Sequence, residues 1–177
     1  MLNNAQVPVV GFAAFSGTGK TTLLKQLLPR LRAAGLRVAV VKHAHHDFEI
    51  DREGKDSFEL RRAGANQLLI ASKHRQALLV ERDEHDALTL DGLLSQLDQR
   101  ELDLILVEGF KREPYTKIEL RRAALKAPYL YPHDATIVAL ATDAQPAQDP
   151  GLPVLDLNDA HAVACFIIDE LVASEAL

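Results

Sequence analysis

The sequence predicts a three-layer α/β fold with a mainly parallel central sheet, and three observations lead to this prediction. Short runs rich in valine, isoleucine and leucine alternate along the chain with longer amphipathic segments, as strands alternate with helices in such folds. Several of these runs are apolar almost throughout, which is typical of strands covered on both faces. With 177 residues, 47% of them hydrophobic and 25% charged, the chain suits a single domain over residues 1–177.

The individual elements follow in order from the apolar pattern. Residues 7–14 (VPVVGFAA) are expected to form the first strand. A helix is expected to begin at Lys20, because five leucines follow at helical spacing and Gly35 can end it. Two later runs joined by the short polar stretch KHR predict an added β-hairpin. The other expected strands are 36–43, 67–72, 76–82, 102–109, 115–122, 136–143 and 152–157, and the other expected helices are 51–65, 88–97 and 158–172.

The composition limits the classes of partner and the compartment. A formal net charge of -5 gives no basic footprint for nucleic acid or for an anionic membrane surface, so neither partner is expected. The apolar stretch near the N-terminus is too short to span a bilayer. Cys165 is the only cysteine, which makes an intrachain disulfide impossible and favours a reducing, cytoplasmic location.

The stretch AFSGTGKT, residues 14–21, links the first expected strand to the first expected helix. It matches the pattern G-x-x-x-x-G-K-[ST] at every fixed position except the first. In this pattern backbone N–H groups surround phosphates, the lysine reaches the terminal ones and the hydroxyl binds Mg²⁺. Ala14 stands in place of the first glycine, so this position must tolerate a Cβ. The loop residues expected to bind nucleotide are Ser16, Gly17, Thr18, Gly19, Lys20, Thr21 and Thr22. In this context the motif predicts a P-loop NTPase.

An acid must accompany this loop, since a carboxylate helps to hold Mg²⁺ or its water shell at a nucleotide phosphate. The run LDLILVEG offers Asp103 and Glu108. Ligands of open α/β sheets bind beyond the carboxyl ends of the strands, and about 16 Å of strand separates these two acids. Glu108 is therefore predicted to act at the metal, and Asp103 to mark the start of the strand.

The same residues predict a simple hydrolytic step. Water would attack the γ-phosphate in line, with Lys20 and the metal beside Glu108 stabilising the transferred charge. No residue in the sequence stands out as a general base. Slow turnover is the consequence, and a partner protein could supply the missing groups.

The stretch KHAHHDFEID follows the second expected strand and should emerge at the same edge of the sheet. Three interpretations stay open. Lys42 and His43 could contact phosphate, with Asp47 near the metal. Alternatively, His43, His45 and His46 could form a transition-metal site, because imidazole is a common ligand, or the stretch could simply face solvent. We adopt the first interpretation.

Four segments occur in the order AFSGTGKTTLL, VKHAHHDFEIDREGKDSFELRRAGA, LDLILVEGFK and ATD. Together they resemble the MobB family of molybdopterin-guanine dinucleotide biosynthesis adapter proteins. The glycine loop is shared by many nucleotide-binding families, whereas the histidine stretch together with GKDS and RRAGA is more specific to this family. The likeness covers nearly the whole chain, and the segment RRAALKAPYLYPHD matches least.

The resemblance implies a homodimer that binds GTP with Mg²⁺, hydrolyses GTP weakly and assists the guanylyltransferase that joins GMP to molybdopterin. The implied partners are therefore the molybdenum cofactor guanylyltransferase and molybdopterin or its guanine dinucleotide. The matched positions are Gly17, Gly19, Lys20, Thr21 and Thr22 in the loop and Asp47, Asp56 and Glu108 among the acids. The hairpin around residues 66–82 would leave an exposed strand edge, which is the expected dimer contact.

Selection of the base and of a second ligand depends on fewer residues. The guanine-reading motif Asn-Lys-x-Asp is absent, so GTP over ATP comes mainly from the resemblance. Asp143, ending the run TIVALATD, could accept from N1 and N2 of guanine or could be an ordinary turn residue. Four arginines could serve an anionic second ligand such as a pterin phosphate, or could be solvated. They are Arg61, Arg62, Arg121 and Arg122.

Two alternative functions could use the same loop. A small-molecule kinase would need an arginine-rich lid over the donor phosphates, and the candidate segment, residues 121–134, has three basic residues early and then turns hydrophobic. A metal-delivery GTPase would hold its cargo on the histidine stretch and would bind nickel or zinc stoichiometrically.

Overall fold

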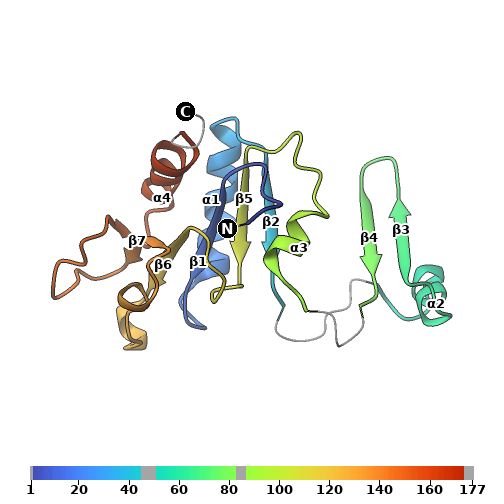
Figure 1. Ribbon diagram of the computed structural model, residues 1–177, viewed down its shortest axis with the longest axis horizontal. Helices are drawn as coiled ribbons and strands as arrows, with labels where there is room; N and C mark the ends of the chain where they lie inside the picture. The colour runs from blue at the N-terminus through green and yellow to red at the C-terminus, as the bar shows by residue number, and fades with distance from the viewer. Residues whose placement is uncertain (1, 45–50, 83–86, 174–177) are drawn as a thin grey trace. The chain divides into compact units, whose positions relative to one another are not determined.

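The computed structural model describes residues 2–44, 51–82 and 87–173, which form two compact units. The first unit comprises Met1–His43 and Thr89–Leu177, and the second comprises Ala44–Leu88. The first holds a large sheet with its helices, and the second holds a hairpin with one helix (Figure 1). The single domain expected over residues 1–177 stays a prediction.

A parallel six-stranded sheet forms the centre of the first unit. Its strand order is β2-β5-β1-β6-β7-β8, and all five pairings are parallel. The strands are β1 (Val9–Ala13), β2 (Val38–Lys42), β5 (Leu104–Glu108), β6 (Lys117–Arg121), β7 (Ile137–Thr142) and β8 (Val154–Asp156). Parallel pairing places every carboxyl end at the same edge of the sheet and requires a crossover between strands.

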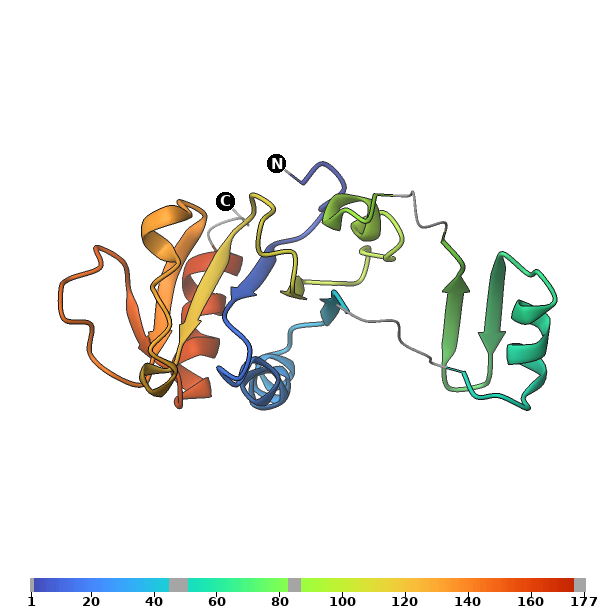
Figure 2. The ribbon, with the colours of Figure 1, turned by 90° about the horizontal axis from the view of Figure 1, so that it is seen from below.

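Helices cover both faces of this sheet. α1 (Lys20–Ala33) and α4 (Ala160–Phe166) pack on one face, and a π-helical stretch over Ile167–Val172 extends α4. α3 (Leu90–Leu94) packs on the other face. Figure 2 shows α1 and α3 on opposite sides of β1. The predicted three-layer α/β fold with a parallel sheet is therefore confirmed.

The strands contribute alternate residues to two separate hydrophobic clusters. Val10 and Phe12 of β1 pack with the leucines of α1, whereas Val9 packs with α3 and Tyr115. Successive side chains of a strand point to opposite faces, so a strand covered by apolar elements on both faces is expected to be apolar at most positions. This explains why the strand runs in the sequence are nearly continuous rather than alternating.

Two long connections cross the sheet face that carries α3. Residues 109–116 lead from β5 to β6, and residues 122–136 lead from β6 to β7. Tyr115 of the first connection lies over Gly11, where an added Cβ would come within 2.5 Å of its ring. The glycine is required here because the connection passes close to the strand.

The second connection satisfies buried charges on β6. Lys117 and Glu119 are each 1% exposed. The backbone N–H groups of Leu130 and Tyr131 donate to the carboxylate of Glu119, and the carboxylate of Asp134 lies 3.1 Å from the Lys117 ammonium. Burial raises the pKa of Glu119. Residues 122–136 therefore cover this charged face of the sheet.

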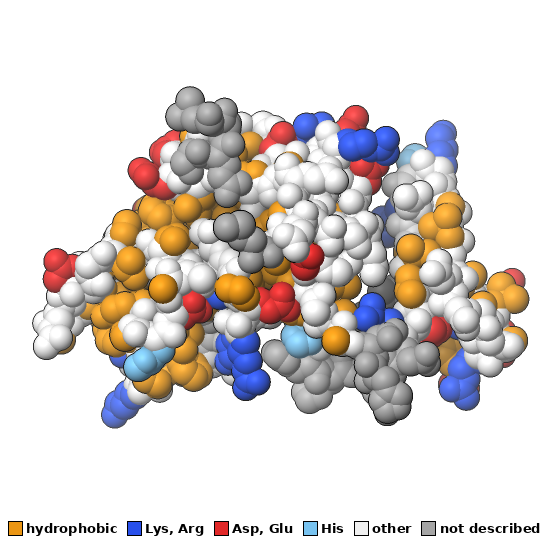
Figure 3. Space-filling view, viewed as in Figure 1, with side chains coloured by type: hydrophobic (Ala, Val, Ile, Leu, Met, Phe, Trp, Pro, Cys, Tyr) orange, Lys and Arg blue, Asp and Glu red, His pale blue; other side chains and the backbone are white. Residues whose placement is uncertain are grey.

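The second unit is the predicted β-hairpin with a short helix. β3 (Gln67–Ala71) and β4 (Gln76–Val80) are antiparallel, and α2 (Asp56–Arg62) lies against β3. Leu69 and Leu78 are register partners, and they are 61% and 53% exposed. Hydrophobic side chains are visible on the surface of this hairpin (Figure 3). One face of the hairpin therefore carries apolar side chains that the described residues do not cover.

The differences from the expected elements lie at their ends. α3 spans Leu90–Leu94 and is shorter than the expected 88–97, because the backbone N–H groups of Gln96 and Leu97 bond to carbonyls three residues back and end the helix in tight turns. α2 begins at Asp56 instead of residue 51.

In the described parts of the chain, no helix is long and apolar enough to cross a membrane.

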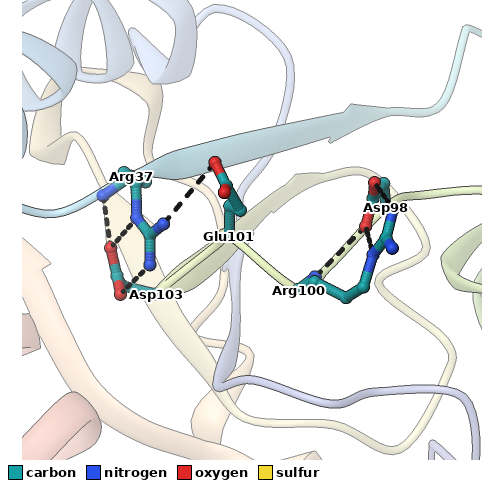
Figure 4. A network of polar contacts seen from close by, with 5 residues as sticks. All are labelled: Arg37, Asp98, Arg100, Glu101 and Asp103. Atoms are coloured by element: carbon teal, nitrogen blue, oxygen red, sulfur yellow. Dashed lines mark hydrogen bonds and ion pairs between the residues drawn. The ribbon is translucent and has the colours of Figure 1, made fainter.

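An ion pair joins the starts of β2 and β5 at the amino edge of the sheet (Figure 4). Asp103 accepts from the backbone N–H of Arg37 at 2.7 Å and from its guanidinium at 3.1 and 3.2 Å. These bonds, the guanidinium first, hold the pKa of Asp103 below its usual value. The predicted place of Asp103 at the start of a strand is confirmed.

We expect Asp103→Asn to lower the melting temperature by a few degrees at pH 7. The folded-state pKa of Asp103 lies below the unfolded one, so its stabilisation is present above pH about 4 and is lost as the pH falls through the folded value. Calorimetric melting from pH 7 to pH 2 should show the wild-type advantage shrinking. Glu101→Gln, which removes a pair at 3.8 Å on a carboxylate 87% exposed, is the control and should change little. A pH-independent difference would contradict this account.

Candidate functional site

The carboxyl edge of the sheet gathers most of the predicted site residues. The glycine loop follows β1, Lys42 ends β2, and Glu108 ends β5. Register pairs Glu108 with Phe12 of β1 on one side and with Lys42 of β2 on the other. Arg122 and Asp143 directly follow β6 and β7 at the same edge. The fold therefore brings together residues more than a hundred positions apart in the chain.

The loop between β1 and α1 has the backbone shape that phosphate binding requires. Gly17 and Gly19 have φ angles of 80° and 100°, which residues with a Cβ rarely adopt. Thr18 lies between them and is 2% exposed, and its hydroxyl donates to the carbonyl of Phe15 at 2.8 Å. The two glycines thus turn the backbone while Thr18 holds the turn. Ala14 is buried without a positive φ, so the loop tolerates its Cβ.

The N-terminus of α1 faces this loop. The first bond of the helix runs from the N–H of Leu23 to the carbonyl of Gly19 at 3.0 Å, so the N–H groups of Lys20, Thr21 and Thr22 have no partner within the helix. Gly19 is the N-cap and offers no side-chain acceptor. These free donors and the positive end of the helix dipole favour an anion.

Lys20 lies folded against the loop. Its ammonium donates to the carbonyls of Ala14 and Phe15, at 3.4 Å each. Burial lowers the pKa of Lys20, the charge of Glu108 opposes this shift, and the charge of Lys111 adds to it. A partly buried ammonium held by two long hydrogen bonds can exchange these bonds for stronger ones to a phosphate.

Glu108 stands at the position predicted for the acid. Its side chain is 15% exposed and lies 3.7 Å from the Lys42 ammonium, which is 61% exposed. The backbone carbonyl of Glu108 accepts from the N–H of His43 at 2.8 Å. The carboxylate is therefore held at the edge between β1 and β2, with the exposed Lys42 as an ion-pair partner.

Close packing fixes the backbone directly after Glu108. Gly109 has a φ of 110°, and a Cβ there would lie 2.5 Å from the Cβ of His43. The ring of His43 stacks on Phe110 with centroids 4.6 Å apart, and the hydroxyl of Tyr115 donates to the carbonyl of Gly109 at 2.8 Å. His43 therefore packs against the residues that directly follow β5.

Arg122 connects the loop to Asp143. Its Nε donates to the carbonyl of Thr18 at 3.2 Å, and its Nη1 donates to the carboxylate of Asp143 at 3.2 Å. Asp143 also accepts from the backbone N–H of Ala123 at 2.8 Å. The ends of β6 and β7 are thus tied to the glycine loop through a single guanidinium.

The donor chemistry of the edge suits Mg²⁺. The hydroxyl of Thr21 and the carboxylate of Glu108 are oxygen ligands, which hard cations prefer, and Thr21 is exposed on the first turn of α1. Asp47, the third predicted metal residue, lies outside the described residues, as do His45 and His46. Within the described ranges, no group of three or more His, Cys, Asp or Glu side chains is placed to hold a metal ion.

Two residues outside the predicted set also belong to this region. The Lys111 ammonium lies 5.7 Å from the ring centroid of Phe15 in the loop, and Tyr115 braces Gly109. The stretch GFK directly after Glu108 was a signal for Lys111, because a residue so close to the strand end must stay near the edge. Nothing in the sequence signals Tyr115, because its contacts depend on the path of residues 109–116.

A glycine loop between the central strand and a helix, with an acid ending the neighbouring strand, defines an α/β protein of the P-loop NTPase type. Residues 9–143 match the family described as MobB, Molybdopterin guanine dinucleotide synthesis protein B. The chain belongs to this family.

Relatives support this assignment over almost the full length. A protein of Escherichia coli K12 named molybdopterin-guanine dinucleotide biosynthesis adapter protein is 46% identical over 170 residues, which is 96% of each chain. A protein of Haemophilus influenzae with the same name is 42% identical over 164 residues, covering 93% of this chain and 89% of the relative.

Solved structures agree with the fold. The crystal structure of Bacillus subtilis MobB superposes with a TM-score of 0.72 at 25% identity, covering 93% of this chain and 98% of that one. A MobB homologue from Bacillus stearothermophilus gives a TM-score of 0.69 at 25% identity, covering 94% and 98%.

We expect Gly109→Ala to destabilise the protein more than Gly35→Ala. Both glycines have a positive φ, which costs a side chain about 1–2 kcal/mol. Gly109 also meets the Cβ of His43, and such overpacking adds about 1–3 kcal/mol, whereas Gly35 has nothing within 4 Å. Urea unfolding measures both free energies of unfolding. Equal losses would show that the contact with His43 does not constrain the acid-bearing strand.

Proposed function

We propose that this protein is a GTP-binding adapter with weak GTPase activity that assists the attachment of GMP to molybdopterin. The observation that carries the proposal is the glycine loop, in which Gly17 and Gly19 bend the backbone around the free N–H groups of α1 and the ammonium of Lys20. The names of the Escherichia coli and Haemophilus influenzae relatives support the pathway. On this proposal the protein acts with the molybdenum cofactor guanylyltransferase and with molybdopterin or its guanine dinucleotide.

The loop would bind the triphosphate mainly through its backbone. The N–H groups from Gly17 to Thr22 would surround the phosphates, and the hydroxyls of Ser16 and Thr22, both exposed, would add side-chain donors. Lys20 would leave the carbonyls of Ala14 and Phe15 and donate to the terminal phosphates. Its positive charge would then stabilise negative charge that develops on the transferred phosphoryl group.

Thr21 and Glu108, with Asp47, would hold Mg²⁺ directly or through water. When bound, the metal would neutralise phosphate charge. The exposed ammonium of Lys42 is paired with Glu108 in the described structure, and a metal ion beside this carboxylate would release Lys42 toward the phosphates. His43 would keep the strand ends in place by its stacking on Phe110.

Selection of guanine is proposed for Asp143. Each of its carboxylate oxygens accepts one hydrogen bond, from Arg122 or from the N–H of Ala123, and each keeps a further lone pair for a donor on the base. These two bonds would orient the carboxylate at the end of β7. The same residue would therefore link the base to the loop through Arg122 and Thr18.

The kinase alternative is less well supported than the adapter. Residues 121–134 would have to act as a basic lid, but this segment is packed against the sheet. Leu130 and Tyr131 donate to Glu119, and the guanidinium of Arg121 stacks on Tyr129 at 4.2 Å. A segment held by buried hydrogen bonds is a poor lid, because opening it would break the bonds from Leu130 and Tyr131 to Glu119.

A homodimer is proposed through the hairpin of the second unit. Leu69 and Leu78 lie opposite each other on one face, and Val80 on the same face is 37% exposed. A two-stranded hairpin is marginally stable alone, and its exposed edge and apolar face favour pairing with a second copy.

Calorimetric titration with GTP and with ATP, each with Mg²⁺, tests nucleotide binding and base choice. We expect Lys20→Ala to weaken GTP binding about 100-fold, because a hydrogen bond to a charged group contributes about 1.5–3 kcal/mol. Lys25→Ala, an exposed lysine on the same helix, is the matched control and should bind as the wild type. Unchanged affinity in Lys20→Ala would refute the loop as the site, and tighter ATP binding would refute the guanine preference. Adding the purified guanylyltransferase to the titration tests the partnership.

Light scattering tests the dimer. We expect the wild type to be a dimer and Leu78→Glu to be a monomer, because a charge at a buried apolar contact is unfavourable. Lys73→Glu changes an exposed residue in the turn between β3 and β4, outside this face, and should stay dimeric. A monomeric wild type, or a dimeric Leu78→Glu, would contradict an interface at this face.

A further inference from the structure

We propose that the hollow between the two crossover connections binds a small organic phosphate monoester next to the nucleotide phosphates. This crossover pocket has a volume of about 420 Å³ and lies between residues 111–114 of the first connection and residues 130–136 of the second, over Ala13. Its size falls within the range of small-molecule sites, about 300–1,000 Å³.

The two acids of the crossover pocket are already engaged by the protein. Both carboxylate oxygens of Glu113 accept from the backbone N–H of Leu90, at 3.0 and 3.2 Å. Asp134 accepts from the N–H and the hydroxyl of Thr136 and pairs with the buried Lys117 ammonium at 3.1 Å. Both acids therefore already accept hydrogen bonds from within the fold, and Asp134 is also paired with a cation.

The basic side chains of the crossover pocket have no such partners. Lys111 and Arg112 are exposed, and in the described parts of the chain neither forms an ion pair with a carboxylate. The imidazole of His133, also exposed, adds a further possible donor across the pocket. Two permanent cations facing a hollow whose acids are occupied favour an anion, and a guanidinium with an ammonium suits a phosphate.

Apolar groups form the remainder of the crossover pocket. Ala13, Pro114 and Leu130 line it, which gives a surface for an uncharged ligand body beside the cations. An inorganic anion would leave this surface without contact. The lining therefore favours an organic phosphate over a free phosphate ion.

The crossover pocket adjoins the glycine loop without being part of it. Ala13 directly precedes the loop, and Lys111 reaches from the pocket to the ring of Phe15. Ala13 shares its strand face with Gly11, which Tyr115 covers, whereas α1 packs on the face of Phe12. A ligand here would approach the phosphates of the nucleotide from the sheet face opposite α1. This reading of the pocket as the place of a second substrate rests on the proposed function.

Titration calorimetry with 4-methylumbelliferyl phosphate tests the pocket in protein whose loop is first saturated with GDP. We expect binding that Lys111→Ala and Arg112→Ala each weaken about 10-fold, as for loss of one hydrogen bond to a charged group. Lys25→Ala should bind as the wild type. The parent 4-methylumbelliferone and inorganic phosphate should each bind at least about 10-fold more weakly.

Several outcomes would overturn the proposal. Equal binding in the Lys111 and Arg112 variants would show that the pocket does not recognise the phosphate, and equal binding of the parent compound would leave only an apolar hollow. Binding that GDP abolishes and that Lys20→Ala removes would assign the probe to the glycine loop. If GDP itself does not bind, the proposed function fails, and binding that still depends on Lys111 and Arg112 would support the pocket independently.

Discussion

The parallel hydrogen-bond ladder between β1 and β5 is the interaction on which the whole candidate site depends. It pairs Phe12 with Glu108, so the strand that leads into the glycine loop and the strand that carries the acid end at the same edge. A slip of one residue would turn Glu108 to the other face of the sheet and bring an apolar side chain to the edge. The complete burial of Ile105 and Leu106 on the two faces fixes the register.

The same edge is shaped by charges that the protein pairs internally before any ligand arrives. Glu108 faces Lys42, and Asp143 holds Arg122 against the loop carbonyl of Thr18. The basic partners Lys42 and Arg122 are 61% and 35% exposed, and ion pairs open to solvent contribute little to stability, so these partners can be exchanged at small cost. On the proposed function, phosphates and a metal ion would replace these contacts, and the site would be assembled without large movements of the strands.

The two connections on the sheet face that carries α3 do more than cover the hydrophobic core. They bury Lys117 and Glu119 by supplying Asp134 and two backbone donors, which is necessary because an unpaired buried charge is strongly destabilising. Their path leaves a hollow beside the loop, where Lys111 and Arg112 lie without carboxylate partners among the described residues. The segments that pair the buried charges of β6 thereby also line the pocket proposed for a second ligand.

The α/β class, the strand runs, the hairpin, the glycine loop and the position of Glu108 at a strand end were predictable from the sequence, because they depend on local periodicity and on motif spacing. The sequence predicted less well where helices end, as for α3, because tight turns depend on neighbouring structure. Only the tertiary structure decided that Arg122 contacts Thr18 and that Tyr115 covers Gly11. These contacts join strands distant in the chain, so their geometry follows from strand order and crossover path, which no local pattern encodes.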